Sequence, residues 1–153
     1  MTAIRIEPAS AADIPDLCGL LALLFAQEAE FAPDAGKQAR GLRLVIEDPR
    51  VGRILVARAD DAVVGMVNLL FTVSTAEGAP AMLLEDMVVR ADHRGHGVGA
   101  LLIDAAVALA CETGCARITL LTDAGNADAQ RFYGRAGFQR SPMIPMRQSI
   151  EPA

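Results

Sequence analysis

The stretch DHRGHGVGALL, residues 92–102, decides how this chain folds. Three glycines stand within five residues, beside one arginine and two histidines, and an apolar run follows at once. The first N–H groups of a helix are unpaired and carry about half a unit of positive charge, and glycines let a phosphate come close to them. We therefore expect a strand at 82–89, a loop at 90–96 and a helix at 97–112, with the loop and Arg94 binding a diphosphate.

The glycine pattern excludes two well-known phosphate loops. Residues 94–99 have the pattern Arg-x-x-Gly-x-Gly, and no Lys-Ser or Lys-Thr pair follows, as it would in a P-loop. The third glycine of the dinucleotide-binding pattern is also missing. Taken alone, the six residues are equally compatible with a glycine-rich turn that joins a strand to a helix and binds nothing.

Hydrophobic periodicity predicts alternating strands and helices in the rest of the chain. Apolar residues spaced three and four apart after Ser10, with Asp13 three positions on, indicate a capped amphipathic helix. Gly114 should end the helix that starts at Gly97, and Asn126 is a typical N-cap for the last one. The other expected elements are strands at 3–7, 53–58, 63–73 and 117–121, helices at 35–46 and 126–137, a turn marked by Gly78 and Pro80, and an extended segment from 138.

Composition bounds the class of protein. With 153 residues, 52% hydrophobic and 22% charged, we expect one soluble α/β domain over 1–153. The net charge of −5 argues against nucleic acid or an anionic membrane as the partner. A mixed N-terminus without a signal peptide and the lack of a long apolar segment predict a cytoplasmic protein. The three cysteines fit no disulfide framework and no known ligand spacing, so we expect small buried thiols and no metal.

From 83 to 138 the chain resembles the GCN5-related N-acetyltransferase (GNAT) family. The shared elements, in order, are the strand LLEDMVV, the loop Arg-Gly-x-Gly-x-Gly, a helix with a double leucine, a short strand, an asparagine and the sequence FYGRAGF. The resemblance implies a single-domain GNAT fold, with a mixed sheet of about six to seven strands and helices on both faces. It also implies acetyl-CoA as the co-substrate and acetyl transfer to an amine by direct attack in a ternary complex.

The family's contacts with coenzyme A can be carried over to matching positions. The diphosphate would rest on the loop at 94–99, and the pantetheine arm would pair with the strand at 87–89, where that strand splays from its neighbour. Asn126 would contact the same arm, and a backbone N–H near Val88 or Val89 would stabilise the oxyanion. For the 3′-phosphate the candidates are Arg131 and Arg135, because both project from the last helix. The residues implied for the cofactor are Met87, Val88, Val89, Arg94, Gly95, His96, Gly97, Val98, Gly99, Asn126 and Arg135.

Two side chains are candidates for the proton transfers. Tyr133, the only tyrosine, lies seven residues after Asn126 and so on the same helix face, and it matches the family's general acid toward the departing thiolate. Glu85 matches an acid that serves as the base, directly or through water, in part of the family. The alternatives are a packing role for Tyr133 and a salt bridge for Glu85. Asp86 adjoins Glu85, so it should point to the opposite face, toward the substrate amine or a buried polar group.

The acceptor amine is the least determined part of the prediction. The strand LLEDMVV is similar to that of the polyamine and thialysine acetyltransferase branch. Glu28, Glu30 and Asp86 are expected on the acceptor side, and with the acidic net charge they favour a small polyamine or diamine. Amino acids, aminoglycosides and protein amines are the alternatives, as is a regulatory module that holds coenzyme A without turnover. Family habit further predicts a homodimer.

Overall fold

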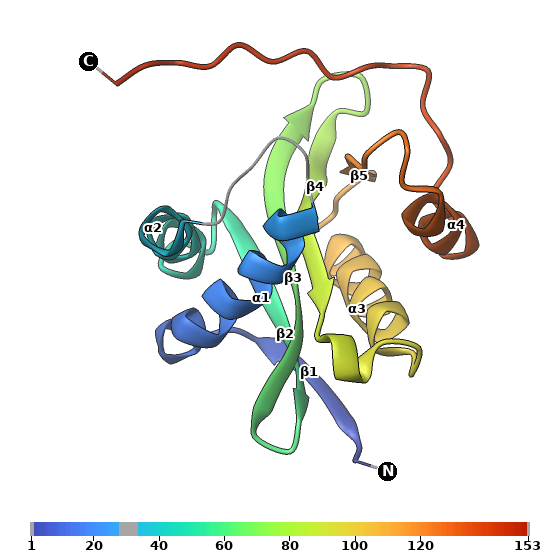
Figure 1. Ribbon diagram of the computed structural model, residues 1–153. Coiled ribbons are helices and arrows are strands. Elements are labelled where there is room, and N and C mark those ends of the chain that lie inside the picture. Colours follow the sequence, from blue (N-terminus) through green and yellow to red (C-terminus); the bar gives the residue numbers. More distant parts are fainter. Residues whose placement is uncertain (1, 28–33, 153) are drawn as a thin grey trace. The chain divides into compact units, whose positions relative to one another are not determined.

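The computed structural model describes residues 2–27 and 34–152, and the chain divides after Asp123 into two compact units. The first unit holds β1 (Ile4–Pro8), α1 (Ile14–Gln27), α2 (Ala35–Ile46), β2 (Gly52–Ala59), β3 (Ala62–Ser74), β4 (Ala79–Val89), α3 (Val98–Glu112) and β5 (Ile118–Leu120) (Figure 1). Short 3₁₀ turns, η1 (Ala11–Asp13) and η2 (Ala91–His93), precede α1 and α3. The second unit holds α4 (Ala127–Arg135) and an extended C-terminal segment.

The strands form one sheet in the order β1-β2-β3-β4-β5, antiparallel except for the parallel pair β4 and β5. This confirms the α/β class, the mixed sheet and the β-α-β crossover through α3. The described residues form five strands, fewer than the six to seven expected, because the segment after Phe138 forms none. Pro142 and Pro145 interrupt that segment, and proline lacks the N–H that a strand ladder needs.

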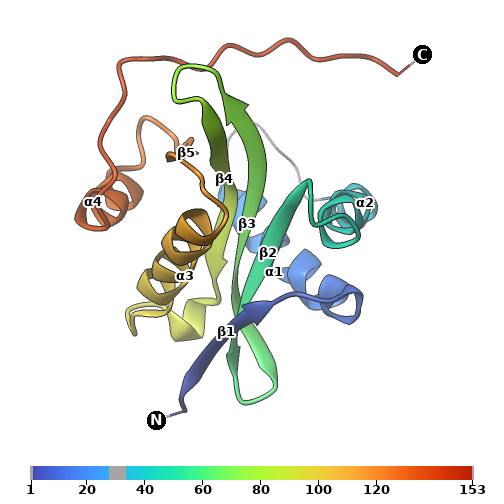
Figure 2. The same ribbon diagram turned by 180° about the vertical axis from the view of Figure 1, so that it is seen from behind.

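Helices cover both faces of the sheet, as expected: α1 and α2 lie on one face and α3 on the other (Figures 1 and 2). The periodicity predicted for α1 is confirmed, because Ile14, Leu17 and Leu21 are buried in one cluster with residues of α2 and of strands β2 to β4. On the other face, α3 buries Val98, Leu102, Ile103, Ala106 and Ala110. Of the two adjacent leucines in this helix, Leu102 is fully buried, whereas Leu101 is 41% exposed.

A close contact at Gly65 positions the start of α3 against the sheet. A Cβ at Gly65 would lie 3.3 Å from Leu102 Cδ1, 3.3 Å from the Val88 carbonyl oxygen and 3.4 Å from Val98 Cγ1. These distances lie at or just below the lower limit of ordinary van der Waals contact, so a side chain at position 65 would push its neighbours by a few tenths of an ångström. The N-terminus of α3 is thereby held beside the end of β4.

Two local expectations differ from the structure. The turn between β3 and β4 ends at Gly78, which has a φ of +64°, whereas Pro80 lies within β4 opposite Val73. The Pro80 carbonyl still accepts a hydrogen bond from the Ala116 N–H at 2.9 Å. All three cysteines are free, but Cys111 is exposed and the other two are only partly buried, so the expectation of buried thiols was wrong for Cys111.

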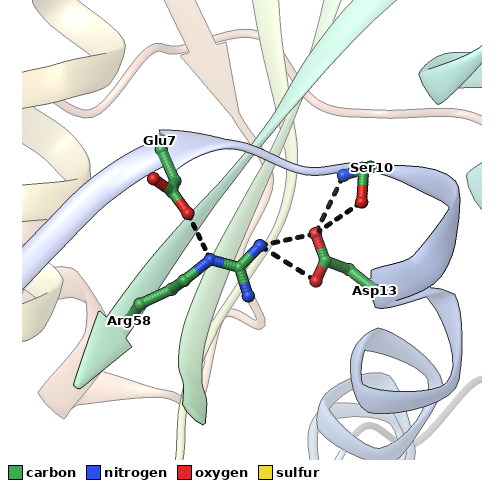
Figure 3. A network of polar contacts seen from close by, with 4 residues as sticks. All are labelled: Glu7, Ser10, Asp13 and Arg58. Carbon is green, nitrogen blue, oxygen red and sulfur yellow. Dashed lines mark hydrogen bonds and ion pairs between the residues drawn. The ribbon is translucent and has the colours of Figure 1, made fainter. Parts of the chain in front are cut away.

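An ion-pair network joins β1, β2 and the start of α1 (Figure 3). Arg58 Nη2 lies 2.9 and 2.8 Å from the two carboxylate oxygens of Asp13, and its Nε donates to Glu7. The Ser10 N–H donates to Asp13 Oδ2 at 2.8 Å, which is the acid half of the predicted capping box. Burial alone would raise the pKa of Asp13, but the hydrogen bonds from Ser10 and Arg58 outweigh it and hold this pKa below its usual value.

Replacing Arg58 by methionine should lower the free energy of unfolding at pH 7 by about 3 kcal/mol, because the buried Asp13 carboxylate would lose its partner. Urea unfolding followed by circular dichroism measures the change. Because the folded pKa of Asp13 is depressed, the pair stabilises the fold above pH of about 4, and this contribution is lost as the pH falls through the folded pKa. The difference between the two proteins should therefore shrink in acid.

The matched control for this prediction is Arg50→Met. Arg50 forms an exposed pair with Asp48, with the Arg50 side chain 91% exposed, so its loss should leave the urea midpoint unchanged. Equal losses in the two variants would contradict the role given to Arg58.

Candidate active site

The candidate site begins at an irregularity in β4. Asp86 pairs with Asn68 and Leu84 pairs with Leu69, so Glu85 is one extra residue on the β4 side, a β-bulge. The parallel pairing with β5 ends at the same place, since its last pair is Leu84 with Leu120. Beyond Glu85 the strand continues along β3 and leaves β5. The pairing of the two strands thus ends beside the bulge, where the splay was predicted.

The departure from β5 leaves one backbone edge of β4 open. The Arg90 N–H donates to the Val64 oxygen at 2.7 Å, which marks this residue pair as hydrogen-bonded across β3 and β4. Because such pairs alternate in an antiparallel ladder, the backbone groups of Met87 and Val89 point away from β3, toward the side that β5 has left. The Val89 oxygen there accepts a hydrogen bond from Arg94 Nε at 3.0 Å.

The glycine loop leads into α3 as predicted, and Gly97 is the N-cap of this helix. Gly95 and Gly97 have φ of +79° and +82°, the left-handed region that glycine adopts without strain. The N–H groups of Val98, Gly99 and Ala100 open the helix; no side chain caps them, and the first turn holds no acid. The loop is solvent-exposed. Exposed donors without a competing carboxylate make this terminus suited to an anion.

His93 lies beside the carboxylate of Asp92 in the loop. Asp92 Oδ1 lies 3.0 Å from His93 Nδ1, and the same carboxylate accepts two hydrogen bonds from Arg90. The hydrogen bonding from Arg90, and to a smaller extent that from His93, holds the pKa of Asp92 well below its usual range. Asp92 thus remains ionised and fixes both side chains at the mouth of the loop.

Asp86 and Asn68 form a polar pair in the sheet, and Asn68 was missed in the sequence. Asn68 is 9% exposed, and its Nδ2 donates to Asp86 Oδ2 at 3.3 Å. Burial raises the pKa of Asp86 to about 6; the Asn68 hydrogen bond opposes this shift, and the Glu85 charge adds to it. The signal available in the sequence was a single amide in the apolar run VVGMVNLLF.

Glu85, expected as the base, is exposed on the bulge, whereas Asp86 is partly buried. The two substrate-side acids Glu28 and Glu30 lie outside the described residues. Among the residues that the structure places, β4 therefore brings together the partly buried Asp86 carboxylate, the exposed Glu85 carboxylate and an open strand edge. The loop adds a helix start suited to an anion.

The second unit carries the remaining predicted residues. Asn126 caps α4, because its Oδ1 accepts from the Ala129 N–H at 3.1 Å. The Tyr133 ring meets Phe132 and Phe138 edge-on, with centroids 5.2 and 5.7 Å apart, and burial raises the pKa of its hydroxyl to about 12. Of the two arginines considered for the 3′-phosphate, Arg131 is paired with Asp128 and Arg135 is exposed.

Within residues 2–27 and 34–152, no group of three or more His, Cys, Asp or Glu side chains is gathered as metal ligands would be. No helix in these ranges has the length and apolar character needed to span a membrane.

Comparison with known proteins gives a consistent set of relatives. The model of the acetyltransferase (GNAT) family matches residues 20–138. N-alpha-acetyltransferase MAK3 of Arabidopsis thaliana is 37% identical over 70 residues, which are 46% of this chain but only 35% of that protein. The integron cassette protein HFX_CASS3, from the mobile metagenome of Cole Harbour Salt Marsh, is 26% identical, with a TM-score of 0.83 over 97% of this chain and 92% of its own.

A more distant solved structure has the same fold. Aminoglycoside N-acetyltransferase AAC(6′)-Iy, in complex with CoA, is 17% identical, with a TM-score of 0.83 over 97% of this chain and 96% of its own.

Replacing Asp86 by asparagine should stabilise the protein at pH 7.5 by about 2 kcal/mol, because the fold disfavours ionisation of this carboxyl. With a folded pKa of about 6, above the unfolded value, the wild-type protein loses stability as the pH rises from about 4 to about 6. The gain in the variant should therefore vanish at pH 4. Urea unfolding at both pH values measures it, and the exposed acid variant Asp104→Asn serves as a control that should not change.

Proposed function

Since the chain belongs to the acetyltransferase (GNAT) family, we propose that it moves the acetyl group of acetyl-CoA onto a primary amine, by direct attack within a ternary complex. One observation carries the proposal: the open edge of β4 at Met87 and Val89 lies directly before an α3 N-terminus that is free of caps and acids. The two features suit the two parts of coenzyme A, an amide-containing arm and a diphosphate.

Binding of the cofactor would use mainly backbone groups. The pantetheine amides would pair with the outward N–H and C=O of Met87, as an added strand does, which leaves the Val89 N–H for the thioester carbonyl. The diphosphate would accept from the N–H groups of 97–99, and Arg94 would add charge. AAC(6′)-Iy, which has the same fold, was solved with CoA, and this supports the assignment. Asn126 and Arg135 of the second unit are proposed as further contacts, with the arm and the 3′-phosphate.

The reaction removes two protons from the acceptor nitrogen. An ammonium with a pKa of about 10 must first lose one proton to become a nucleophile. A carboxylate of β4, Glu85 or Asp86, would accept this proton. The neutral amine then attacks the thioester carbon, and the Val89 N–H would stabilise the oxyanion. The C–S bond breaks, the Tyr133 hydroxyl gives its proton to the departing sulfur as the general acid, and the second proton of the nitrogen restores that hydroxyl.

The kind of amine that accepts the acetyl group is proposed from the acidic charge of the protein. A small polyamine or diamine suits an acidic protein whose acceptor side would carry Asp86, together with Glu28 and Glu30. Two relatives carry names that point to other amines, since one is an N-alpha-acetyltransferase and one an aminoglycoside acetyltransferase. Protein N-termini and aminoglycosides are therefore the second and third acceptors to test. A cytoplasmic homodimer completes the proposal.

The decisive experiment is thiol release from acetyl-CoA with a panel of amines. Release that depends on an amine, and that continues past one equivalent of enzyme, supports the enzyme. Tight binding of coenzyme A in calorimetry without release for any amine would instead favour the regulatory module.

Gly97→Val should weaken coenzyme A binding at least about tenfold, because a side chain at a φ of +82° strains the loop and covers the first N–H groups of α3. Isothermal titration calorimetry measures the affinity. Gly78→Val is the matched control, since Gly78 also has a positive φ but lies in the β3–β4 turn. Unchanged affinity in Gly97→Val would place the diphosphate elsewhere.

Tyr133→Phe should lower kcat about 10²-fold and leave the affinity for acetyl-CoA nearly unchanged, because the lost hydroxyl acts only as the thiolate leaves. With a pKa of about 12, the hydroxyl stays protonated throughout the assay range. Steady-state kinetics at saturating acetyl-CoA provide the measurement. An unchanged kcat would return Tyr133 to a packing role with Phe132 and Phe138.

A further inference from the structure

The Asn68–Asp86 pair is unusual for a sheet interior because its hydrogen bonding is incomplete. Asn68 Nδ2 donates to Asp86, but Asn68 Oδ1 is buried and has no partner among the described residues. An unsatisfied buried acceptor costs about 1–3 kcal/mol, and a carboxylate away from water costs more. Groups kept at such a cost are commonly part of a site that a ligand completes.

The pair lies on a defined face of the sheet. Asn68 and Asp86 are opposite each other, two residues along from Met66 and Val88, so all four side chains share one face. Met66 and Val88 belong to the cluster that packs against α1 and α2. The pair thus lies on the α1–α2 face, at the residue where β4 leaves β5, whereas Val98 at the start of α3 packs over Gly65 on the opposite face.

We propose that Asn68 and Asp86 together form the subsite for the acceptor nitrogen, a primary ammonium. One N–H of the ammonium donates to the Asp86 carboxylate, and a second donates to Asn68 Oδ1. This inference rests on the proposed function, which requires an amine beside the open edge of β4. It names Asn68 as a substrate contact and positioning residue that neither the sequence nor the family resemblance had indicated.

The pair also completes the first proton transfer. The ammonium N–H bond breaks, its proton passes to Asp86, and the nitrogen keeps the electron pair with which it attacks the thioester carbon. Asp86 ends neutral and releases this proton to water after the product leaves. The second proton of the nitrogen replaces the one that Tyr133 gives to the coenzyme A sulfur, so charge and atoms balance. Asn68 keeps one donor on Asp86 and therefore fixes the orientation of the carboxylate.

Two properties favour Asp86 over its neighbour Glu85 as the proton acceptor. Asp86 is partly buried and held by an amide, whereas Glu85 is exposed on the bulge. A base works best when its pKa approaches the working pH, and burial moves Asp86 in that direction. Glu85 then acts through its charge, which favours the protonated form of Asp86.

Few other titratable groups surround the pair. The same face of β3 carries Met66, Asn68 and Leu70, none of which titrates. In α1, which packs on β4, the titratable side chains are Asp16, exposed near the helix start, and Cys18, whose pKa burial raises. In the described part of the chain, Glu85 is therefore the charged neighbour whose removal should change the pKa of Asp86.

The first test measures the subsite without turnover. Carbon-13 NMR of the aspartate carboxyls, with coenzyme A bound, follows the titration of Asp86, which is assigned by loss of its signal in Asp86→Asn. Adding n-butylamine should lower the pKa of Asp86, because an ammonium favours the carboxylate, and n-butanol should not. In Asn68→Leu the pKa of Asp86 should start higher and the amine effect should weaken. An Asp86 signal indifferent to n-butylamine would overturn the proposal.

The second test uses the pH dependence of kcat for whichever amine is turned over. Asn68→Leu should move the acidic limb to higher pH and raise KM for the amine about tenfold, the effect of losing a hydrogen bond to a charged group. Glu85→Gln should move the limb to lower pH, and Asp86→Asn should abolish it. A limb that disappears in Glu85→Gln and persists in Asp86→Asn would overturn the assignment.

The matched control removes a polar group elsewhere on the same face of β3. Thr72→Val deletes a hydroxyl that donates to the Ala81 oxygen at 3.4 Å, four residues from Asn68, and should leave both readouts unchanged. The two proposals fail separately. If the Asp86 pKa responds to n-butylamine but no amine gives thiol release, the proposed function is contradicted and the subsite is not. If thiol release occurs but the Asp86 pKa does not respond, the subsite is contradicted and the proposed function is not.

Discussion

One extra residue in β4 sets the geometry of the candidate site. From Met82 to Leu84 the strand pairs on both edges, with β3 and β5. At Glu85 the bulge bends it, and from there only β3 continues beside it. The open backbone edge, the two carboxylates of β4 and the loop that starts α3 all follow closely after this point in the chain.

The site has a region suited to an anion, at the start of α3, and a region suited to a cation, at the acids of β4, and the two are close in the sequence. The start of α3 has no acid in its first turn and no capping side chain, although the protein as a whole is acidic. The acids are placed before it, at Glu85 and Asp86 on β4. A coenzyme with phosphates and an amine acceptor would each meet backbone or side chains of the suitable sign. In contrast, the Arg58 network holds one guanidinium between the carboxylates of Glu7 and Asp13 and is structural.

The parts of the fold that could be predicted from the sequence are those with a local cause. The helix from Gly97, its glycine N-cap and the Asn126 cap follow from backbone preferences that act within one turn. Strand order near α3 followed from the crossover rule. The bulge had no local cause, because its position depends on how β3 and β4 pair. Asn68 was missed for a related reason: it became meaningful only once the register placed it opposite Asp86.

The bulge also determines which kinds of genetic change β4 tolerates. A substitution at Glu85 alters one exposed side chain. Loss of that single codon would instead leave Leu84 opposite Leu69 and Asp86 opposite Asn68 as consecutive pairs of a regular ladder, so the bulge would be lost. The strand would then lack the irregularity at which the candidate site begins. Related chains should consequently vary in the identity of this residue more readily than in the length of the strand around it.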